Sequence, residues 1–335
     1  MALSDNLPYP SVAVVGAGAW GTALALVAAN LGRKVTLWAR EADVVASVNG
    51  AHENKRFLPG VTLPSSLAAT GTLSECAASE AILVVTPAQH LRATLVALRN
   101  SIKPGTPVVI CAKGIEGNSG ALLSEVLTEV LPDAEPAMLS GPSFARDVAM
   151  GKPTAVTIAA RGSIARRLQA TLNAPTFRTY ASDDIVGVAL GGAAKNVYAI
   201  ACGMVEGEGL GESARAALLA RSFAELMRLG VALGAKGETL MGLSGLGDLV
   251  LTATSKTSRN FALGVALGRG ASLKDASGEG KPLAEGAFTA PALVARGKRE
   301  GVELPVAEAV ADVIAGKLDV KRAAERLLAR PVGKE

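Results

Sequence analysis

The stretch SVAVVGAGAWGTALALVAANLGRKVTLWAR, residues 11–40, decides the fold of this chain. A short apolar run leads into a glycine-rich turn, an uncharged helical segment follows, and a second apolar run comes after it. Gly16, Gly18 and Gly21 have the G-x-G-x-x-G spacing. The first glycine permits a sharp turn, the second lets a pyrophosphate approach bare backbone, and the third lets helix and strand pack closely. Because amides at a helix start attract anions, we expect a nucleotide-binding turn; the alternative is an ordinary tight turn.

The first half of the chain alternates apolar runs with helical patterns. This alternation predicts an α/β Rossmann domain with a doubly wound, mostly parallel sheet covered on both faces. We expect helices over residues 20–31, 89–100, 119–131 and 164–173. The expected strands are residues 12–15, 35–38, 81–86, 108–111, 137–140, 155–159 and 176–180.

From residue 182 onward helical periodicity dominates and strand signals almost vanish. We expect helices over residues 185–205, 214–233, 261–267, 287–300, 305–315 and 320–328. The change of pattern predicts two domains, a dinucleotide-binding domain over residues 1–185 and an all-helical domain over residues 186–335. The polar residues of the second domain, described below, make it the candidate for binding substrate and for catalysis.

Composition narrows the class of function. The chain has 335 residues, 49% of them hydrophobic and 19% charged, with a formal net charge of +4. This length is ample for two domains with their own cores. Basic residues form no run with interleaved aromatics, so nucleic-acid binding is not expected.

The cysteines and the N-terminus favour a cytoplasmic protein. Cys76, Cys111 and Cys202 are widely separated and odd in number, which fits neither a disulfide framework nor a zinc pattern, and no metal site is expected. The first residues, MALSDNLPYP, lack the basic and apolar regions of a signal peptide. Residues 185–205 are apolar enough to resemble a membrane span, but Lys195 near their middle would be costly in lipid, so we expect a buried helix.

Ligands of open α/β sheets bind outside the carboxyl ends of the strands. Lys113 follows one expected strand beside a glycine, and the Gly-Pro-Ser sequence that contains Gly141 and Ser143 follows another. These residues are therefore expected to line one edge of a cleft. The alternative for Lys113 is a surface lysine in a loop.

Lys195 is the strongest candidate for proton transfer. It is the only charged residue between Asp184 and Glu206, and burying an ammonium group is unfavourable unless it faces a polar cleft. Asn196 beside it could orient substrate or water. The alternative is a lysine that reaches solvent from the side of a helix. The two histidines, His52 and His90, both lie in the first half of the chain, and His90 is a weaker candidate for a base than Lys195.

A third group of polar residues lies in GLSGLGDLVLTATSKTSRN. Asp248 follows two glycines in an otherwise uncharged stretch, and Thr252 lies four residues later. Ser258, Arg259 and Asn260 offer hydroxyl, guanidinium and amide donors suited to a phosphate. The alternative is that Ser258 only caps the next helix.

These motifs resemble a known family. GAGAWGTALA, CAKGIE, LSGPSFA, GGAAKNVYAI, GLGDLVLT and SRNFALG occur in this order and spacing, and they are similar to those of bacterial NAD(P)-dependent sn-glycerol-3-phosphate dehydrogenases. The resemblance runs from residue 12 to the last helices. It implies a Rossmann domain followed by an all-helical domain and reduction of dihydroxyacetone phosphate to sn-glycerol 3-phosphate. It further implies supply of glycerophospholipid synthesis and a homodimer in the cytoplasm.

The resemblance also implies residue roles. Lys195 would be the general acid–base group, with Asp248 and Thr252 ordering it and the substrate hydroxyls. Lys113 would contact substrate and cofactor. The substrate contacts would also include Gly141, Ser143, Ser258, Arg259 and Asn260. The cofactor contacts would also include Ala19, Trp20, Ala145, Arg259, Leu283 and Glu285.

Cofactor choice depends on the end of the second strand. An acidic residue there binds the ribose 2′-hydroxyl of NAD, whereas an arginine accepts the 2′-phosphate of NADP. The segment reads Leu-Trp-Ala-Arg-Glu, with Arg40 followed by Glu41. We therefore expect NADP(H) to be favoured and NAD(H) to be accepted as well.

Two other functions are compatible with parts of the pattern. A 6-phosphogluconate or β-hydroxyacid dehydrogenase has the same two-domain plan with a helical lysine and asparagine, but the SRN and GLGD segments favour a small phosphorylated substrate. A non-catalytic, redox-sensing nucleotide-binding protein would not need the lone cation Lys195.

Overall fold

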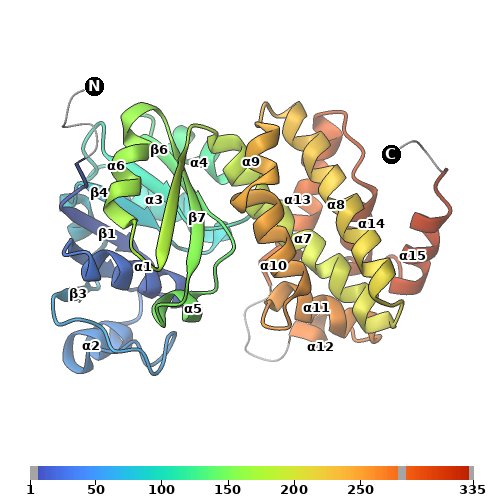
Figure 1. Ribbon diagram of the computed structural model, residues 1–335, viewed down its shortest axis with the longest axis horizontal. Coiled ribbons are helices and arrows are strands. Elements are labelled where there is room, and N and C mark those ends of the chain that lie inside the picture. Colours follow the sequence, from blue (N-terminus) through green and yellow to red (C-terminus); the bar gives the residue numbers. More distant parts are fainter. Residues whose placement is uncertain (1–6, 278–283, 332–335) are drawn as a thin grey trace. The chain divides into compact units, whose positions relative to one another are not determined.

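The structure is a computed structural model that describes residues 7–277 and 284–331. The chain forms two compact units. One comprises Met1–Lys113 with Leu123–Ala189, and the other comprises Gly114–Leu122 with Leu190–Glu335 (Figure 1). The division after Ala189 lies slightly beyond the limit expected at residue 185. Gly114–Leu122 joins the second unit, where Arg299 Nη2 donates to the Gly120 carbonyl oxygen over 3.1 Å.

The first unit is built on one eight-stranded sheet with the order β3-β2-β1-β4-β5-β6-β7-β8. All neighbouring strands are parallel except β6 and β7, which are antiparallel. The predicted doubly wound, mostly parallel sheet is therefore confirmed. The strands are β1 (Ser11–Val15), β2 (Lys34–Trp38), β3 (Leu67–Thr70), β4 (Ala81–Val84), β5 (Pro107–Ile110), β6 (Glu135–Ser140), β7 (Thr154–Ala160) and β8 (Phe177–Ser182).

The burial of the central strands explains why their sequences are continuously apolar. Every residue of β4 and of β5 is buried, because both faces of the sheet are covered. Such runs contain no polar position to reveal a period, yet their shortness and β-branched residues identify them as strands. The edge strand β3 escaped prediction because it has only four residues, two of them small alanines.

Helices of the first unit cover the sheet. The expected helix over residues 119–131 begins only at Leu123, because Ile115 and Leu122 form an isolated β-bridge in the preceding segment. The helical elements are α1 (Ala19–Asn30), α2 (Ala42–Ala51), η2 (Leu73–Ala78), η3 (Ala88–His90), α3 (Leu91–Leu98), α4 (Leu123–Val130), α5 (Ala145–Ala149) and α6 (Gly162–Leu172).

The second unit is helical throughout the part that the structure describes, apart from that bridge (Figure 1). Its long helix, α7, is apolar enough by length and composition to cross a membrane, but 89% of its most apolar window is buried inside the protein, as in a core helix. The elements are α7 (Ile185–Glu208), α8 (Glu212–Ala232), α9 (Gly237–Met241), the π-helical turn η4 (Leu243–Gly247), α10 (Asp248–Thr254), α11 (Arg259–Gly268), α12 (Leu273–Ser277), α13 (Glu285–Arg299), α14 (Pro305–Ile314) and α15 (Val320–Leu328).

Helices α7 and α11 pack unusually closely because glycines face each other. A Cβ atom at Gly203 would lie 2.2 Å from the Phe261 carbonyl oxygen, and one at Gly264 would lie 2.1 Å from the Ile200 carbonyl oxygen. No side chain fits in this contact. The close approach holds the first turn of α11 against α7, the helix that carries Lys195.

Candidate active site

The three glycines of the first turn have the geometry that their spacing predicts. Gly16 has φ +117°, a conformation that side chains rarely adopt. A Cβ atom at Gly18 would meet nothing within 4 Å, so bare backbone faces open space there. A Cβ atom at Gly21 would lie 1.8 Å from the Gly16 carbonyl oxygen, so the third glycine permits close packing of turn and helix. This cradle fits a pyrophosphate group.

Helix α1 starts directly at this turn. Ala19 and Trp20 are its first two residues, and Gly18 at its N-cap has no side chain to bond the free amides. Trp20 Nε1 and Thr86 Oγ1 are buried and have no hydrogen-bond partner among residues 7–277 and 284–331. Thr86 follows β4, and its backbone nitrogen lies against Gly16. The sequence pattern places Thr86 at the end of the expected strand 81–86 and gives it no role, whereas the observed strand ends at Val84.

Arg40 lies just beyond β2, where its side chain is 78% exposed. Its Nη2 atom is 3.1 Å from Glu41 Oε1. The structure therefore puts the cation expected to bind a 2′-phosphate in a surface ion pair, which a phosphate group could replace at small cost.

Lys113, Gly141 and Ser143 come together at the carboxyl ends of β5 and β6. Lys113 Nζ donates to the Gly141 carbonyl oxygen over 3.0 Å, and Ser143 Oγ donates to the same oxygen over 3.1 Å. A Cβ atom at Gly141 would lie 2.8 Å from the Val156 Cα atom, which requires glycine there. Ala145 begins α5 two residues after Ser143. Lys113 is half-buried, and its ammonium group is bonded to this turn.

Lys195 is buried and lies in a polar cluster. Its Nζ atom donates to Asp248 Oδ1 over 2.5 Å and to Thr252 Oγ1 over 2.9 Å. Thr252 Oγ1 in turn donates to the Asp248 carbonyl oxygen over 2.6 Å. The alternative of a lysine that reaches solvent is wrong, because only 7% of the residue is exposed.

The backbone around Gly191 brings Asp248 to Lys195. A Cβ atom at Gly191 would lie 2.5 Å from the Ser244 carbonyl oxygen, so the small residue lets the π-helical turn η4 pack against α7. Asp248 begins α10 directly after this turn. π-Helical turns are rare in proteins, and those that occur are often found at functional sites.

Asn196 joins the lysine to the start of α11. Asn260 Nδ2 donates to Asn196 Oδ1 over 2.9 Å, and Asn260 Oδ1 accepts from the Gly286 amide over 2.9 Å. Ser258 caps α11, because its Oγ atom accepts from the Phe261 amide over 3.2 Å. Ser258 is therefore the N-cap of this helix, and the exposed Arg259 lies on the first turn of the capped helix.

Of the two predicted cofactor contacts late in the chain, Glu285 and Leu283, the structure describes only Glu285. Glu285 is the first residue of α13. Leu283 lies outside the described residues, so the structure says nothing of its position.

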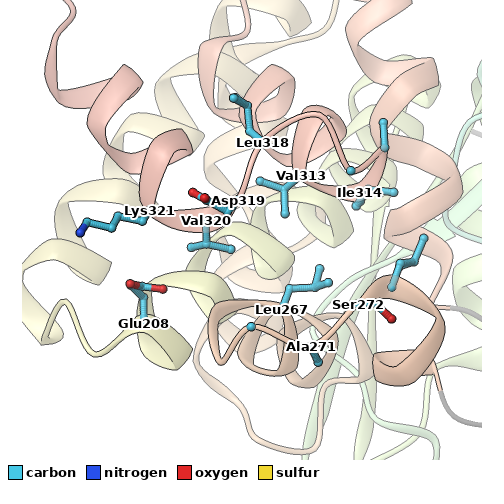
Figure 2. Close-up of a pocket in the computed structure, with 14 residues that line it drawn as sticks. Glu208, Leu267, Ala271, Ser272, Val313, Ile314, Leu318, Asp319, Val320 and Lys321 are labelled. Atoms are coloured by element: carbon cyan, nitrogen blue, oxygen red, sulfur yellow. The ribbon is translucent and has the colours of Figure 1, made fainter.

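A cavity of about 490 Å³ occurs elsewhere in the second unit. Figure 2 shows Leu267, Val313 and Val320 around this hollow, with Glu208 and Lys321 at one side. None of the predicted site residues that the structure describes lines it. We therefore assign this cavity no role in the reaction.

Side chains that could ligate a metal ion, and the cysteines, are two further features of the described residues. They contain no group of three or more His, Cys, Asp or Glu side chains that could hold a metal ion. All three cysteines are buried and unpaired. Burial raises the pKa of the Cys76 thiol to about 12 and that of the Cys202 thiol to about 12, which keeps both protonated.

The fold and these residues define a class, the dinucleotide-dependent oxidoreductases with a Rossmann domain and a helical domain that carries a buried lysine. Comparison with known proteins gives the particular family. Residues 11–165 match the N-terminal model of NAD-dependent glycerol-3-phosphate dehydrogenase, and residues 184–325 match its C-terminal model. The chain belongs to this family.

Individual relatives agree with the family models. The chain is 55% identical over 331 residues to the glycerol-3-phosphate dehydrogenase [NAD(P)+] of Parvibaculum lavamentivorans, covering 98% of this chain and 99% of the relative. It is 56% identical to the enzyme of the same name from Rhodospirillum rubrum, covering 96% and 93%. The crystal structure of glycerol-3-phosphate dehydrogenase from Coxiella burnetii superposes with a TM-score of 0.91 at 38% identity, covering 96% and 99%.

Proposed function

We propose that this protein reduces dihydroxyacetone phosphate to sn-glycerol 3-phosphate with NADPH or NADH. The reaction is reversible: the ketone, the reduced nicotinamide and one proton give the secondary alcohol and the oxidised nicotinamide. The observation that carries the proposal is the buried cluster of Lys195, Asp248 and Thr252, which is linked through Asn196 to the first turn of α11. A proton donor and an anion-binding helix start are thereby held in one unit.

Lys195 acts as the proton donor in the reduction. When bound, the reduced nicotinamide supplies the hydride for substrate C2. As negative charge develops on the C2 oxygen, the Lys195 ammonium stabilises it and donates a proton. Asp248 balances the charge of the ammonium in the buried site, and Thr252 fixes the position of Nζ. In the reverse direction Lys195 takes the proton from the C2 hydroxyl.

The substrate phosphate is assigned to the start of α11. Arg259 offers forked donors suited to phosphate oxygens, and the helix dipole favours an anion at this end. Ser258 and Asn260 already make hydrogen bonds within the second unit. We therefore propose that they hold the start of the helix in place as well as bind the phosphate. Lys113, Gly141 and Ser143 supply the substrate contacts of the first unit.

The dinucleotide is assigned to the glycine turn of the first unit. Gly16, Gly18 and Gly21 form the cradle, and the other contacts are those of the described family positions: Ala19, Trp20, Arg40, Lys113, Ala145, Arg259 and Glu285. The relatives' names include both NAD and NADP, which supports use of either. Arg40 supports a preference for NADPH, since its guanidinium can bind the 2′-phosphate.

The cellular setting is proposed from the family. We place the protein in the cytoplasm as a homodimer, where the product supplies glycerophospholipid synthesis. The alternative of a 6-phosphogluconate or β-hydroxyacid dehydrogenase lacks support, because both halves of the chain match glycerol-3-phosphate dehydrogenase.

One assay tests the proposed function. Purified protein is mixed with NADPH and dihydroxyacetone phosphate, and the loss of reduced-nicotinamide absorbance is followed. We expect rapid loss with the phosphorylated ketone and little with unphosphorylated dihydroxyacetone. No loss with either NADPH or NADH, in protein shown to bind the cofactor, would contradict the proposal.

A further inference from the structure

The side chain of Asn54 supports the glycine turn from a distant part of the chain. Asn54 is fully buried, with 0% of the residue exposed. Its Nδ2 atom donates to the Ala17 carbonyl oxygen over 2.8 Å and to Thr22 Oγ1 over 2.8 Å. Ala17 lies between Gly16 and Gly18, and Thr22 lies on α1. One amide group therefore bonds both the turn and the helix that follows it.

The loop after α2 fixes the Asn54 side chain in this position. Asn54 Oδ1 accepts from the Phe57 amide over 3.1 Å, and the Asn54 carbonyl oxygen accepts from the Leu58 amide over 2.9 Å. The loop is closed at its base by the bridge between Glu53 and Thr62. With both ends of its amide bonded, the side chain cannot turn away without leaving buried polar groups unsatisfied.

The bond to Ala17 sets the direction of an amide that would face the ligand. In a trans peptide the carbonyl oxygen and the next N–H point in opposite directions. Holding the Ala17 carbonyl on the Asn54 side therefore turns the Gly18 N–H away from Asn54. A Cβ atom at Gly18 would meet nothing within 4 Å, and the Gly18 N–H belongs to the turn at which the pyrophosphate is expected to bind.

We propose that Asn54 is a positioning residue for the dinucleotide: it holds the peptide between Ala17 and Gly18 in the orientation that binds pyrophosphate. The inference rests on the proposed function, since it requires NADPH or NADH to bind at this turn. It assigns Asn54 no contact with the cofactor. Loss of its amide donors should weaken cofactor binding while the chemical step, carried by Lys195, continues.

The test is a binding titration without turnover. NADPH fluorescence is titrated with wild-type protein, Asn54→Ala and Asn54→Asp, the last of which keeps the side-chain shape but removes both N–H donors. We expect the NADPH Kd to rise about tenfold in Asn54→Ala and further in Asn54→Asp, where a carboxylate faces a carbonyl oxygen. At saturating NADPH, kcat and the KM for dihydroxyacetone phosphate should remain within about twofold of wild type.

Asn49→Ala provides a matched control. Asn49 also makes two side-chain bonds to backbone of the first unit, to the Ala69 carbonyl oxygen over 2.9 Å and from the Ala69 amide over 2.8 Å, but it does not touch the glycine turn. Its loss should leave the NADPH Kd unchanged. Thr22→Val replaces the Asn54 variants if these do not fold, and it should raise the Kd by a smaller factor.

The outcomes separate the inference from the proposed function. An unchanged NADPH Kd in the variants of Asn54, or in Thr22→Val if it is used, would overturn the inference, as would an equal rise in Asn49→Ala. A wild-type protein that binds NADPH but does not reduce dihydroxyacetone phosphate refutes the proposed function and leaves the binding test of Asn54 in force. A wild-type protein that does not bind NADPH or NADH refutes both.

Discussion

Lys195 Nζ lies 2.5 Å from Asp248 Oδ1 in an ion pair whose side chains are 9% and 1% exposed. Taking two charges out of water is costly, and their attraction compensates only when both are present and well bonded. Thr252 supplies a further bond to the lysine. The pair is thus a buried group whose position depends on the packing of α7 against η4 and α10.

Removal of the lysine should abolish the proposed chemistry but not cofactor binding. We expect Lys195→Ala to lower kcat by about 10³-fold, because no group remains to protonate the substrate oxygen. The NADPH Kd, measured by fluorescence, should be unchanged. Lys317→Ala is the control, since Lys317 pairs with Asp312 over 3.5 Å at the surface of the same unit. An unchanged kcat in Lys195→Ala would refute its role.

The ion pair should affect stability in a way distinct from activity. Asp248→Leu alone leaves the buried Lys195 ammonium without its Asp248 carboxylate and should lower the free energy of unfolding by about 3–5 kcal/mol. The double variant Lys195→Met/Asp248→Leu removes both charges and should recover much of that loss. Activity should stay absent in both. Urea titration measures the stability, and a double variant less stable than Asp248→Leu would contradict the prediction.

Substitution of two glycines of the first turn should have different effects, one on stability and the other on cofactor binding. Gly21→Ala would place a Cβ atom 1.8 Å from the Gly16 carbonyl oxygen, so we expect a loss of stability visible as a lower Tm. Gly18→Ala meets no protein atom within 4 Å, so Tm should hardly change while NADPH binding weakens, because the methyl group occupies the proposed pyrophosphate position. Equal Tm losses in the two variants would contradict this division.

Arg40 should control discrimination between the two cofactors. We expect Arg40→Ala to raise the KM for NADPH about tenfold and to leave the KM for NADH nearly unchanged, since only NADPH carries the 2′-phosphate. Glu41→Gln should lower the KM for NADPH, because it removes the carboxylate that now pairs with Arg40. Arg92→Ala breaks a comparable surface pair with Glu129 and is the control. Equal effects on both cofactors would exclude the role of Arg40.

Glu225 should make stability depend on pH. Burial raises the pKa of its carboxyl group to about 7, although hydrogen bonds donated by the backbone amides of Val306 and Ala307 oppose the shift. Since the ordinary pKa is 4.5, the folded state keeps a proton that the unfolded state releases between pH 4.5 and 7. The stability contributed by this group therefore falls as pH rises through this window, by on the order of 2–3 kcal/mol.

The variant Glu225→Gln tests this dependence, because its amide stays neutral throughout. The difference in unfolding free energy, Glu225→Gln minus wild type, should increase from pH 5 to pH 8. Urea titrations at several pH values measure it. A constant difference would show that Glu225 does not titrate in this range.

Local sequence was sufficient where local physics decides the structure. The central strands were predicted because burial on both faces requires continuous apolar runs, and the glycine turn was predicted because each of its three glycines meets its own steric demand. The helix α10, which begins at Asp248, was not predicted, since its seven residues are too few to show a period. Ser258 could be read as a cap or a phosphate ligand, and only the position of the Phe261 amide established the cap.

The amino-acid pattern alone was enough to predict the class of fold, the dinucleotide turn and the identity of the polar residues in unusual surroundings. Tertiary structure decided which of these meet. Lys195 and Asp248 are 53 residues apart in the chain, and Asn196 and Asn260 are 64 apart. Asn54 reaches Ala17 across 37 residues and carried no sequence signal at all. The physical reason is that such contacts depend on how closely helices and loops pack. Small residues such as Gly191 and Gly203 permit close packing, but no local sequence pattern specifies which elements will meet.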